Sequence, residues 1–159
     1  EKIGEVVALI PDRALTLAFV DPEALHVRFE TLETLTNNRR VDLLVLFADR
    51  MDIVRNVASY AEQEESKLDL FMGKNCNWRA EWNALPKQSA QHVCNLFNEL
   101  YQQQLCERLG YQVFADKVVG SHKSRLYRLI YASKSPTGKD FWEKIIKVDS
   151  AGQQGLAGF

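Results

Sequence analysis

Leu15-Thr16-Leu17-Ala18-Phe19-Val20-Asp21-Pro22 is a short apolar run that ends on an acid followed by a proline. Six mostly apolar residues without a polar alternation predict a strand that is buried on both faces. Asp21 then stands at the carboxyl end of that strand. Because ligands of open α/β sheets bind in the crevice beyond the strand ends, Asp21 is the first candidate for a catalytic residue.

The residues after this run predict a helix and a second strand. Asp21-Pro22 is also a standard helix start, with Asp as N-cap and Pro in the first turn, so a purely structural role for Asp21 stays open. Leu25, Phe29, Leu32 and Leu35 follow at helical spacing. Residues 41–47 form a second continuous apolar run, and strand, helix and strand together predict a right-handed βαβ unit with parallel strands.

The rest of the chain predicts further elements in a fixed order. Asp49 is placed to cap a helix over residues 53–61, and residues 89–109 form a long helix that Gly110 stops. Residues 111–119 and 125–133 predict two strands of an antiparallel hairpin. Asp140, in a capping-box-like sequence, opens a last helix. We therefore expect one α/β domain over residues 1–150 and a glycine-rich tail over residues 151–159.

Residues 68–86 predict an irregular segment that carries two tryptophans. Trp78 and Trp82 are four residues apart, which places them on one face of a short helical turn. A small satellite core under a long loop is the first interpretation. A lid over the site is the alternative, in which Trp78, Trp82 and Pro22 contact substrate.

Composition and charge exclude several classes of protein. The chain has 159 residues, 46% of them hydrophobic, and a net charge of -1, as expected for a globular domain without a general attraction to nucleic acid or membranes. No apolar run is long enough for a membrane span and no signal-peptide pattern opens the chain, so a cytoplasmic location is the default. The three cysteines are widely spaced, which favours reduced thiols without a disulfide framework or a metal site.

The hairpin offers a second candidate site. Eight Lys or Arg residues lie between positions 117 and 147 against two acids. Such a cluster can bind phosphates, and neighbouring tyrosines can stack on bases, so a nucleic-acid-binding or assembly module without catalysis is the alternative to an enzyme. Surface lysines on a hairpin also serve simply to prevent sheet-to-sheet pairing. The candidate nucleic-acid contacts are Lys117, Lys123, Arg125 and Arg128.

Several local strings resemble a known family. They are Phe19-Val20-Asp21-Pro22, the segment 70–73 (LFMG) followed by Trp78, the segment 127–134 (YRLIYASK), and Gly138 ahead of Trp142. Together they resemble the three-Cys-motif partner protein family, a bacterial group with a methyltransferase-like domain. The family name refers to cysteines in a neighbouring protein, so the cysteines of this chain are no support for it.

The resemblance implies a fold and a reaction. It implies a three-layer, Rossmann-like methyltransferase-type sheet, of which this chain supplies the C-terminal half, and S-adenosylmethionine as cofactor. Asp21 would stand beside the transferred methyl group, and a three-Cys-motif protein would be a partner. The family commonly has a glycine after its Asp-Pro, where this chain has Glu23-Ala24.

One part of the methyltransferase fold is missing from the sequence. No G-x-G-x-x-G-like loop occurs, although the adenosyl cradle of such folds needs one after the first strand. We therefore expect a methyltransferase-like protein of unknown acceptor that, as this chain alone, does not bind S-adenosylmethionine and is inactive.

Overall fold

The centre of the fold is a mixed four-stranded sheet. The computed structural model describes residues 2–23, 25–86, 89–121 and 124–146. The strands are β1 (Leu15–Val20), β2 (Arg40–Phe47), β3 (Val113–Ser121) and β4 (Ser124–Ser133), and they lie in the order β1-β2-β4-β3. β1 and β2 are parallel, whereas β4 runs antiparallel to both β2 and β3. The chain is thus an α/β protein in which a parallel pair precedes an antiparallel hairpin, as the sequence predicts.

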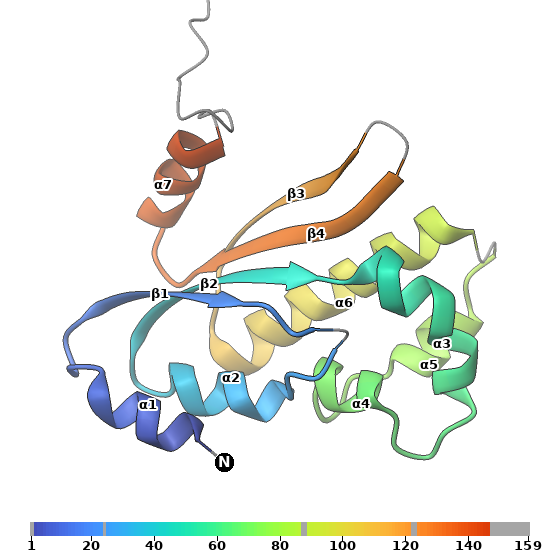
Figure 1. The fold of residues 1–159 in the computed structure, drawn as a ribbon, viewed down its shortest axis with the longest axis horizontal. Coiled ribbons are helices and arrows are strands. Elements are labelled where there is room, and N and C mark those ends of the chain that lie inside the picture. The colour runs from blue at the N-terminus through green and yellow to red at the C-terminus, as the bar shows by residue number, and fades with distance from the viewer. Residues whose placement is uncertain (1, 24, 87–88, 122–123, 147–159) are drawn as a thin grey trace, which may run out of the picture.

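The helices lie mainly on one side of this sheet (Figure 1). In the view of Figure 1, α1, α2 and α6 lie beneath the sheet, whereas α7 stands on its other side. The helical segments are α1 (Ile3–Leu9), α2 (Phe29–Thr36), the π-helix η1 (Asp49–Ile53), α3 (Val54–Ala61), α4 (Lys67–Met72), α5 (Trp78–Asn83), α6 (Ala90–Leu109) and α7 (Thr137–Ile146). In the following sections, the face of the sheet toward α2 and α6 is called the lower face, and the face toward α7 the upper face.

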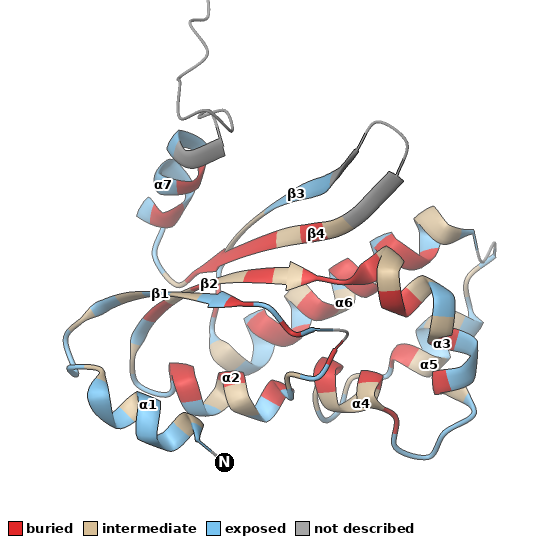
Figure 2. Ribbon diagram, viewed as in Figure 1, coloured by how far each residue is buried: buried red, intermediate tan, exposed pale blue. Residues whose placement is uncertain are grey.

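β2 carries the core of the domain on its lower face. Its side chains alternate, with Val41, Leu43, Val45 and Phe47 all buried and the residues between them more exposed (Figure 2). Asp42 lies on the upper face, where its carboxylate accepts hydrogen bonds from the Tyr131 hydroxyl (2.6 Å) and the Ser133 hydroxyl (2.7 Å). The apolar run therefore tolerates an acid because that acid has two donors on β4.

β1 differs from its prediction. The sequence predicts a strand buried on both faces, but β1 is the edge of the sheet and its exposure alternates. Leu15, Leu17 and Phe19 are exposed by 83%, 49% and 61%. They share the upper face with the β2 residues beside which they are registered.

The helix after β1 also starts later than predicted. α2 begins at Phe29, after an N-cap at Arg28, and the described residues between Asp21 and Arg28 form a loop instead of the first helical turns. Within this loop the His26 amide donates to the Pro22 carbonyl at 2.8 Å, and Leu25 is buried with a φ of 67°. The proposed N-cap role of Asp21 is therefore wrong, because no helix begins at that residue.

Residues 68–86, predicted to be irregular, contain helical structure. α4 begins with a capping box between Ser66 and Asp69, and α5 carries both tryptophans on one short helix, as their spacing predicts. Trp78 is fully buried and packs against Phe97, so it belongs to the main core. The prediction of an irregular segment fails because these short helices depend on tertiary contacts more than on local pattern.

The last part of the chain follows the sequence closely. α6 has Ser89 as its N-cap and Gly110 at its C-terminal end with a φ of 74°. Asp49, predicted to cap a helix, is instead the first residue of η1, whose N-cap is Ala48. α7 packs on the upper face of the hairpin, where Trp142 stacks on Tyr131 with ring centroids 5.4 Å apart.

Candidate functional site

A cavity lies at the carboxyl ends of β1 and β2. Because these strands are parallel, the residues that follow both of them meet at one edge of the sheet. The cavity has a volume of about 410 Å³. It is lined by Asp21, Pro22, Glu23, Leu46, Ala48, Met51, Asp52 and Tyr127.

The Asp21 side chain is accessible to a ligand in the cavity. Its side chain is exposed and lines the cavity, whereas Pro22 beside it is buried and fixes the start of the loop. The backbone of Glu23 has a φ of 31°, a conformation that L-residues rarely adopt. Strained backbone of this kind is concentrated at functional sites, because the surrounding structure must hold it in place.

Asp52 forms a preorganised wall of the same cavity. Its buried carboxylate accepts hydrogen bonds from the Tyr60 hydroxyl (2.5 Å), the Asn56 amide (2.9 Å) and the Lys67 ammonium (3.1 Å). Burial alone raises the pKa of Asp52, but these three donors outweigh it and lower the pKa below its usual value. Asp52 is therefore ionised at neutral pH and held in one orientation.

The sequence reasoning missed Asp52, although a signal for it exists. Asp52, Asn56 and Tyr60 are spaced four residues apart, so one side of a continuous helical segment brings an acid, an amide and a phenol together. Lys67 lies on α4, outside that helical segment, so the four-residue spacing does not predict its ion pair with Asp52.

The charge of the cavity is negative. Asp21, Glu23 and Asp52 supply carboxylates, and none of the described residues that line the cavity is a lysine or arginine. Carboxylates accept hydrogen bonds and attract cations or amino groups, and they repel phosphates. The arrangement can therefore orient a group that brings N–H or O–H donors.

Trp78 and Trp82 are not part of this cavity. The Trp78 indole N–H donates to the Asp69 carboxylate at 2.8 Å, and the Arg79 guanidinium lies over its ring at 4.4 Å. Trp78 is fully buried, which contradicts its predicted role in binding substrate. Trp82 is half-buried on α5 and is absent from the described residues that line the cavity, so only Pro22 of the three predicted substrate contacts lies there.

Arg128 does not lie on the surface of the hairpin, where the sequence predicts it. Its guanidinium points into the protein and pairs with Asp49 at 3.2 Å and with Asp116, and the residue is 8% exposed. Arg128 is therefore an internal ion-pair residue and not a surface contact for phosphates. Lys117 is exposed on β3, while Lys123 and the side chain of Arg125 lie outside the described part of the chain.

The described residues contain no candidate metal site and no candidate membrane-spanning helix. No group of three or more His, Cys, Asp or Glu side chains in the described part could hold a metal ion. Among the helices that the structure describes, none is both long and apolar enough to cross a membrane.

The chain matches no protein-family model, no curated protein and no solved structure.

Proposed function

We propose that this chain is the acceptor-binding part of a methyltransferase-like domain, and that Asp21 orients the group to be methylated. The observation that carries the proposal is the position of Asp21. It is an exposed carboxylate that caps no helix and lines a cavity at the carboxyl ends of two parallel strands. The resemblance of residues 15–148 to the three-Cys-motif partner family, whose domain is methyltransferase-like, supports the reaction class.

Two details of the fold support the same proposal. A parallel pair followed by an antiparallel hairpin is the arrangement that the resemblance implies for the second half of the domain. Glu23-Ala24 stands where the family commonly has a glycine shortly after its Asp-Pro, and Glu23 has a positive φ, a region that glycine favours.

The described residues do not fit S-adenosylmethionine. The turns that follow β1 and β2 contain no glycine, and the carboxylates of the cavity provide no cradle of backbone N–H groups. The next glycine in the chain after these turns, Gly73, lies at the end of α4 instead. We therefore derive no step through the cofactor from this chain.

The residues of the cavity suggest how the acceptor would be held. The Asp21 carboxylate accepts a hydrogen bond from an N–H or O–H group of the acceptor, which fixes the direction of the lone pair and provides a base for the released proton. The carboxylates of Asp21 and Glu23 disfavour a phosphate at this point and favour an amino group, whereas the charge of Asp52 is paired with the Lys67 ammonium. Tyr127 adds an aromatic wall against which a planar acceptor can lie.

The test uses the protein as its gene encodes it. We expect labelled S-adenosylmethionine to bind, and Asp21→Asn to lower transfer of its methyl group to mixed DNA, RNA and protein acceptors by roughly 10²–10⁴-fold, the range of general acid–base catalysis. Binding of the cofactor should be unchanged in Asp21→Asn. Glu62→Gln, at an exposed carboxylate after α3, is the matched control. Failure of the unaltered protein to bind the cofactor would exclude the proposal.

A further inference from the structure

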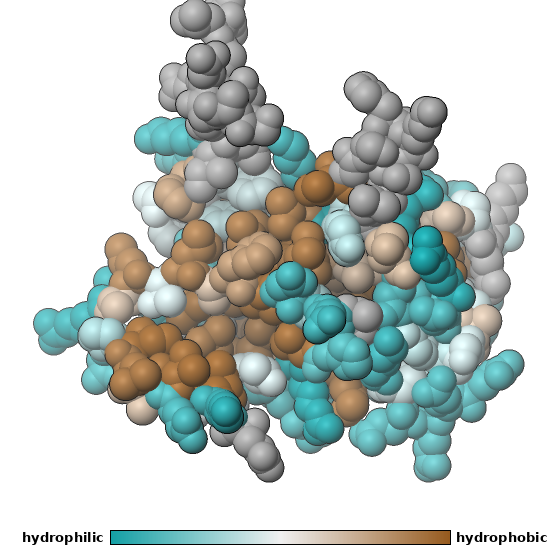
Figure 3. Space-filling model, viewed as in Figure 1, coloured by the Kyte–Doolittle hydropathy of each residue, from teal (hydrophilic) through white to brown (hydrophobic). Residues whose placement is uncertain are grey.

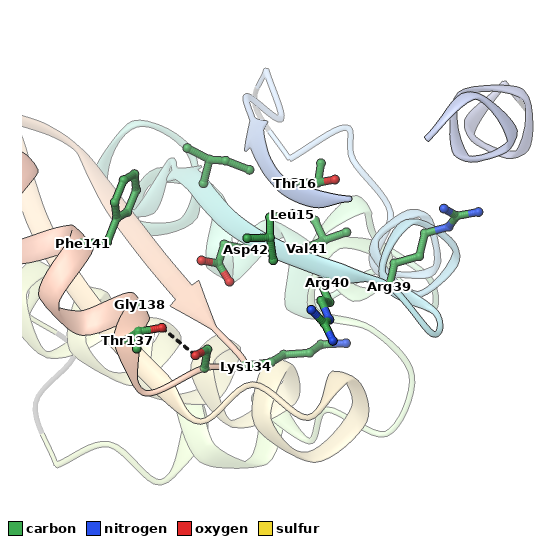
Figure 4. Close-up of a pocket in the computed structure, with 12 residues that line it drawn as sticks. Leu15, Thr16, Arg39, Arg40, Val41, Asp42, Lys134, Thr137, Gly138 and Phe141 are labelled. Atoms are coloured by element: carbon green, nitrogen blue, oxygen red, sulfur yellow. Dashed lines mark hydrogen bonds between the residues drawn. The ribbon is translucent and has the colours of Figure 1, made fainter. Parts of the chain in front are cut away.

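A groove crosses the upper face at the end of the sheet opposite the Asp21 cavity. It has a volume of about 540 Å³ and lies between β1, β2 and α7 (Figure 4). Leu15 and Arg40, the first residues of β1 and β2, both line it, so it lies at the amino-terminal ends of these strands. Ligand pockets in proteins have volumes of roughly 300–1,000 Å³. The groove is therefore large enough to hold a small molecule.

The walls of this groove are apolar. Leu15 of β1 lies on one side and Phe141 of α7 on the other (Figure 4). Leu15, Leu17 and Phe141 are exposed by 83%, 49% and 49%. Hydrophobic surface gathers in the same half of the molecule, over β1 and α1 (Figure 3). Exposed apolar side chains that face one concave space indicate a place for an apolar ligand group.

An acid lies between these apolar walls. Asp42 lines the groove and is registered beside Leu17. Its two carboxylate oxygens each accept one hydrogen bond, from the hydroxyls of Tyr131 and Ser133. No lysine or arginine among the described residues forms an ion pair with Asp42. The carboxylate is thus fixed in orientation, keeps further lone pairs for a ligand, and has a charge that no cation of the described part compensates.

This charge limits what can fill the groove. Asp42 also has a structural task, because the Ser133 hydroxyl that it orients accepts a hydrogen bond from the Ser135 amide at the start of the turn to α7 (3.1 Å). Hydrogen bonding of two hydroxyls does not require a charged acceptor, however. A purely apolar occupant would remove water from the carboxylate without supplying a cation, which is costly. The occupant must therefore bring a cationic N–H donor to Asp42.

The groove also has one available cation at its rim. The Arg39 guanidinium donates to the Ile10 carbonyl at 2.7 Å, and the Lys134 ammonium donates to the Thr36 carbonyl at 3.2 Å, so both are already bound within the protein. Arg40 is exposed, and none of the described residues forms a hydrogen bond or an ion pair with its side chain. An anionic group of a ligand can therefore pair with Arg40 without breaking an internal contact.

We propose that the groove binds a free apolar amino acid. Its ammonium donates to the Asp42 carboxylate, its carboxylate pairs with the Arg40 guanidinium, and its side chain lies between Leu17 and Phe141. Arg40 and Asp42 are two residues apart on one face of β2, a separation of about 7 Å along the strand, so opposite charges on one small ligand can reach both. The groove and the Asp21 cavity share no lining residue, so the inference is independent of the proposed function.

The experiment compares three probes of nearly the same shape in the protein as its gene encodes it. L-Phenylalanine carries both charges, phenethylamine lacks the carboxylate, and 3-phenylpropionate lacks the ammonium. Each is titrated while amide signals are followed by NMR. We expect phenylalanine to shift the amides of residues 15–17 and 40–42, and each single-charge analogue to bind at least about tenfold more weakly, because it loses one charge-assisted contact.

Variants test the residues that carry the proposal. Arg40→Gln should weaken phenylalanine binding about tenfold, and Arg55→Gln, at an exposed position of α3, is the matched control and should leave it unchanged. Asp42→Asn should weaken it at least as much. Because Asp42 also orients Ser133, Leu17→Trp provides a second test that leaves this contact in place: its larger ring occupies the groove and should abolish binding.

Three results would overturn the inference. The first is no binding of phenylalanine to the unaltered protein. The second is equal binding of phenylalanine and phenethylamine, or of the unaltered protein and Arg40→Gln, which would show that no carboxylate is recognised. The third is a set of shifts confined to the amides of Asp21 and Glu23, which would place the probe in the other cavity. Loss of methyl transfer tests only the proposed function.

Discussion

Arg128→Met tests the internal ion pair that replaces a predicted surface contact. The Arg128 side chain is 10% exposed, and its partner Asp49 is 6% exposed, so removal of the guanidinium leaves a buried carboxylate without its cation. Breaking a buried pair from one side costs about 3–5 kcal/mol. The partner Asp116 is 32% exposed and can be hydrated, so it adds little. We expect the whole loss to come from Asp49.

A loss of this size is large enough to measure. A domain of this kind has a free energy of unfolding of about 5–15 kcal/mol, so urea unfolding followed by circular dichroism would show a clear shift of the midpoint. Arg55→Met, at an exposed position of α3, is the control and should change stability by no more than about 0.5 kcal/mol. The double variant Asp49→Asn, Arg128→Met should be more stable than Arg128→Met alone, because it removes the unpaired charge.

The reasoning would be refuted by either of two outcomes. If Arg128→Met is as stable as Arg55→Met, the pair does not stabilise the fold. If the double variant is less stable than Arg128→Met by the full cost of Asp49→Asn alone, the two residues do not interact energetically.

Two further predictions concern acid stability and the docking of α7. Burial raises the pKa of Asp69, but hydrogen bonds led by that from Arg79 outweigh burial and hold the pKa at about 2. The stability that ionised Asp69 contributes is therefore fully present above the unfolded pKa of 3.8 and is lost as the pH falls toward 2. Asp69→Asn should therefore flatten the decline of the thermal midpoint between pH 4 and pH 2, and an unchanged slope would contradict the assignment. Gly138→Ala should destabilise the protein by about 1–3 kcal/mol, because its Cβ would lie 2.4 Å from the Ser133 Cβ. Gly4→Ala, with nothing within 4 Å, is the control in thermal unfolding and should not destabilise it.

The candidate site was only partly accessible to sequence reasoning. Asp21 could be selected because an acid after an apolar run is a local pattern, and the order of strands predicts which edge it joins. The spacing of Asp52 to Asn56 and Tyr60 is visible in the sequence, but the contact with Lys67, fifteen residues later, depends on tertiary structure. For Trp78 the sequence leaves a core and a lid both open, with the core as the first interpretation, because a tryptophan has the same local sequence in either place. Only the contacts with Phe97 and Asp69 distinguish them.

Local patterns in the sequence set the order of the elements, because apolar runs, caps and glycine stops act over a few residues. The β2 strand, the helix ended by Gly110 and the antiparallel hairpin all follow from such patterns. Tertiary structure alone decided where each element lies. Burial of Arg128 depends on Asp49, 79 residues earlier in the chain. The apolar run of residues 15–20 favours a buried strand wherever it is placed, and only the pairing of the whole sheet puts it at a free edge with Asp21 open to a cavity.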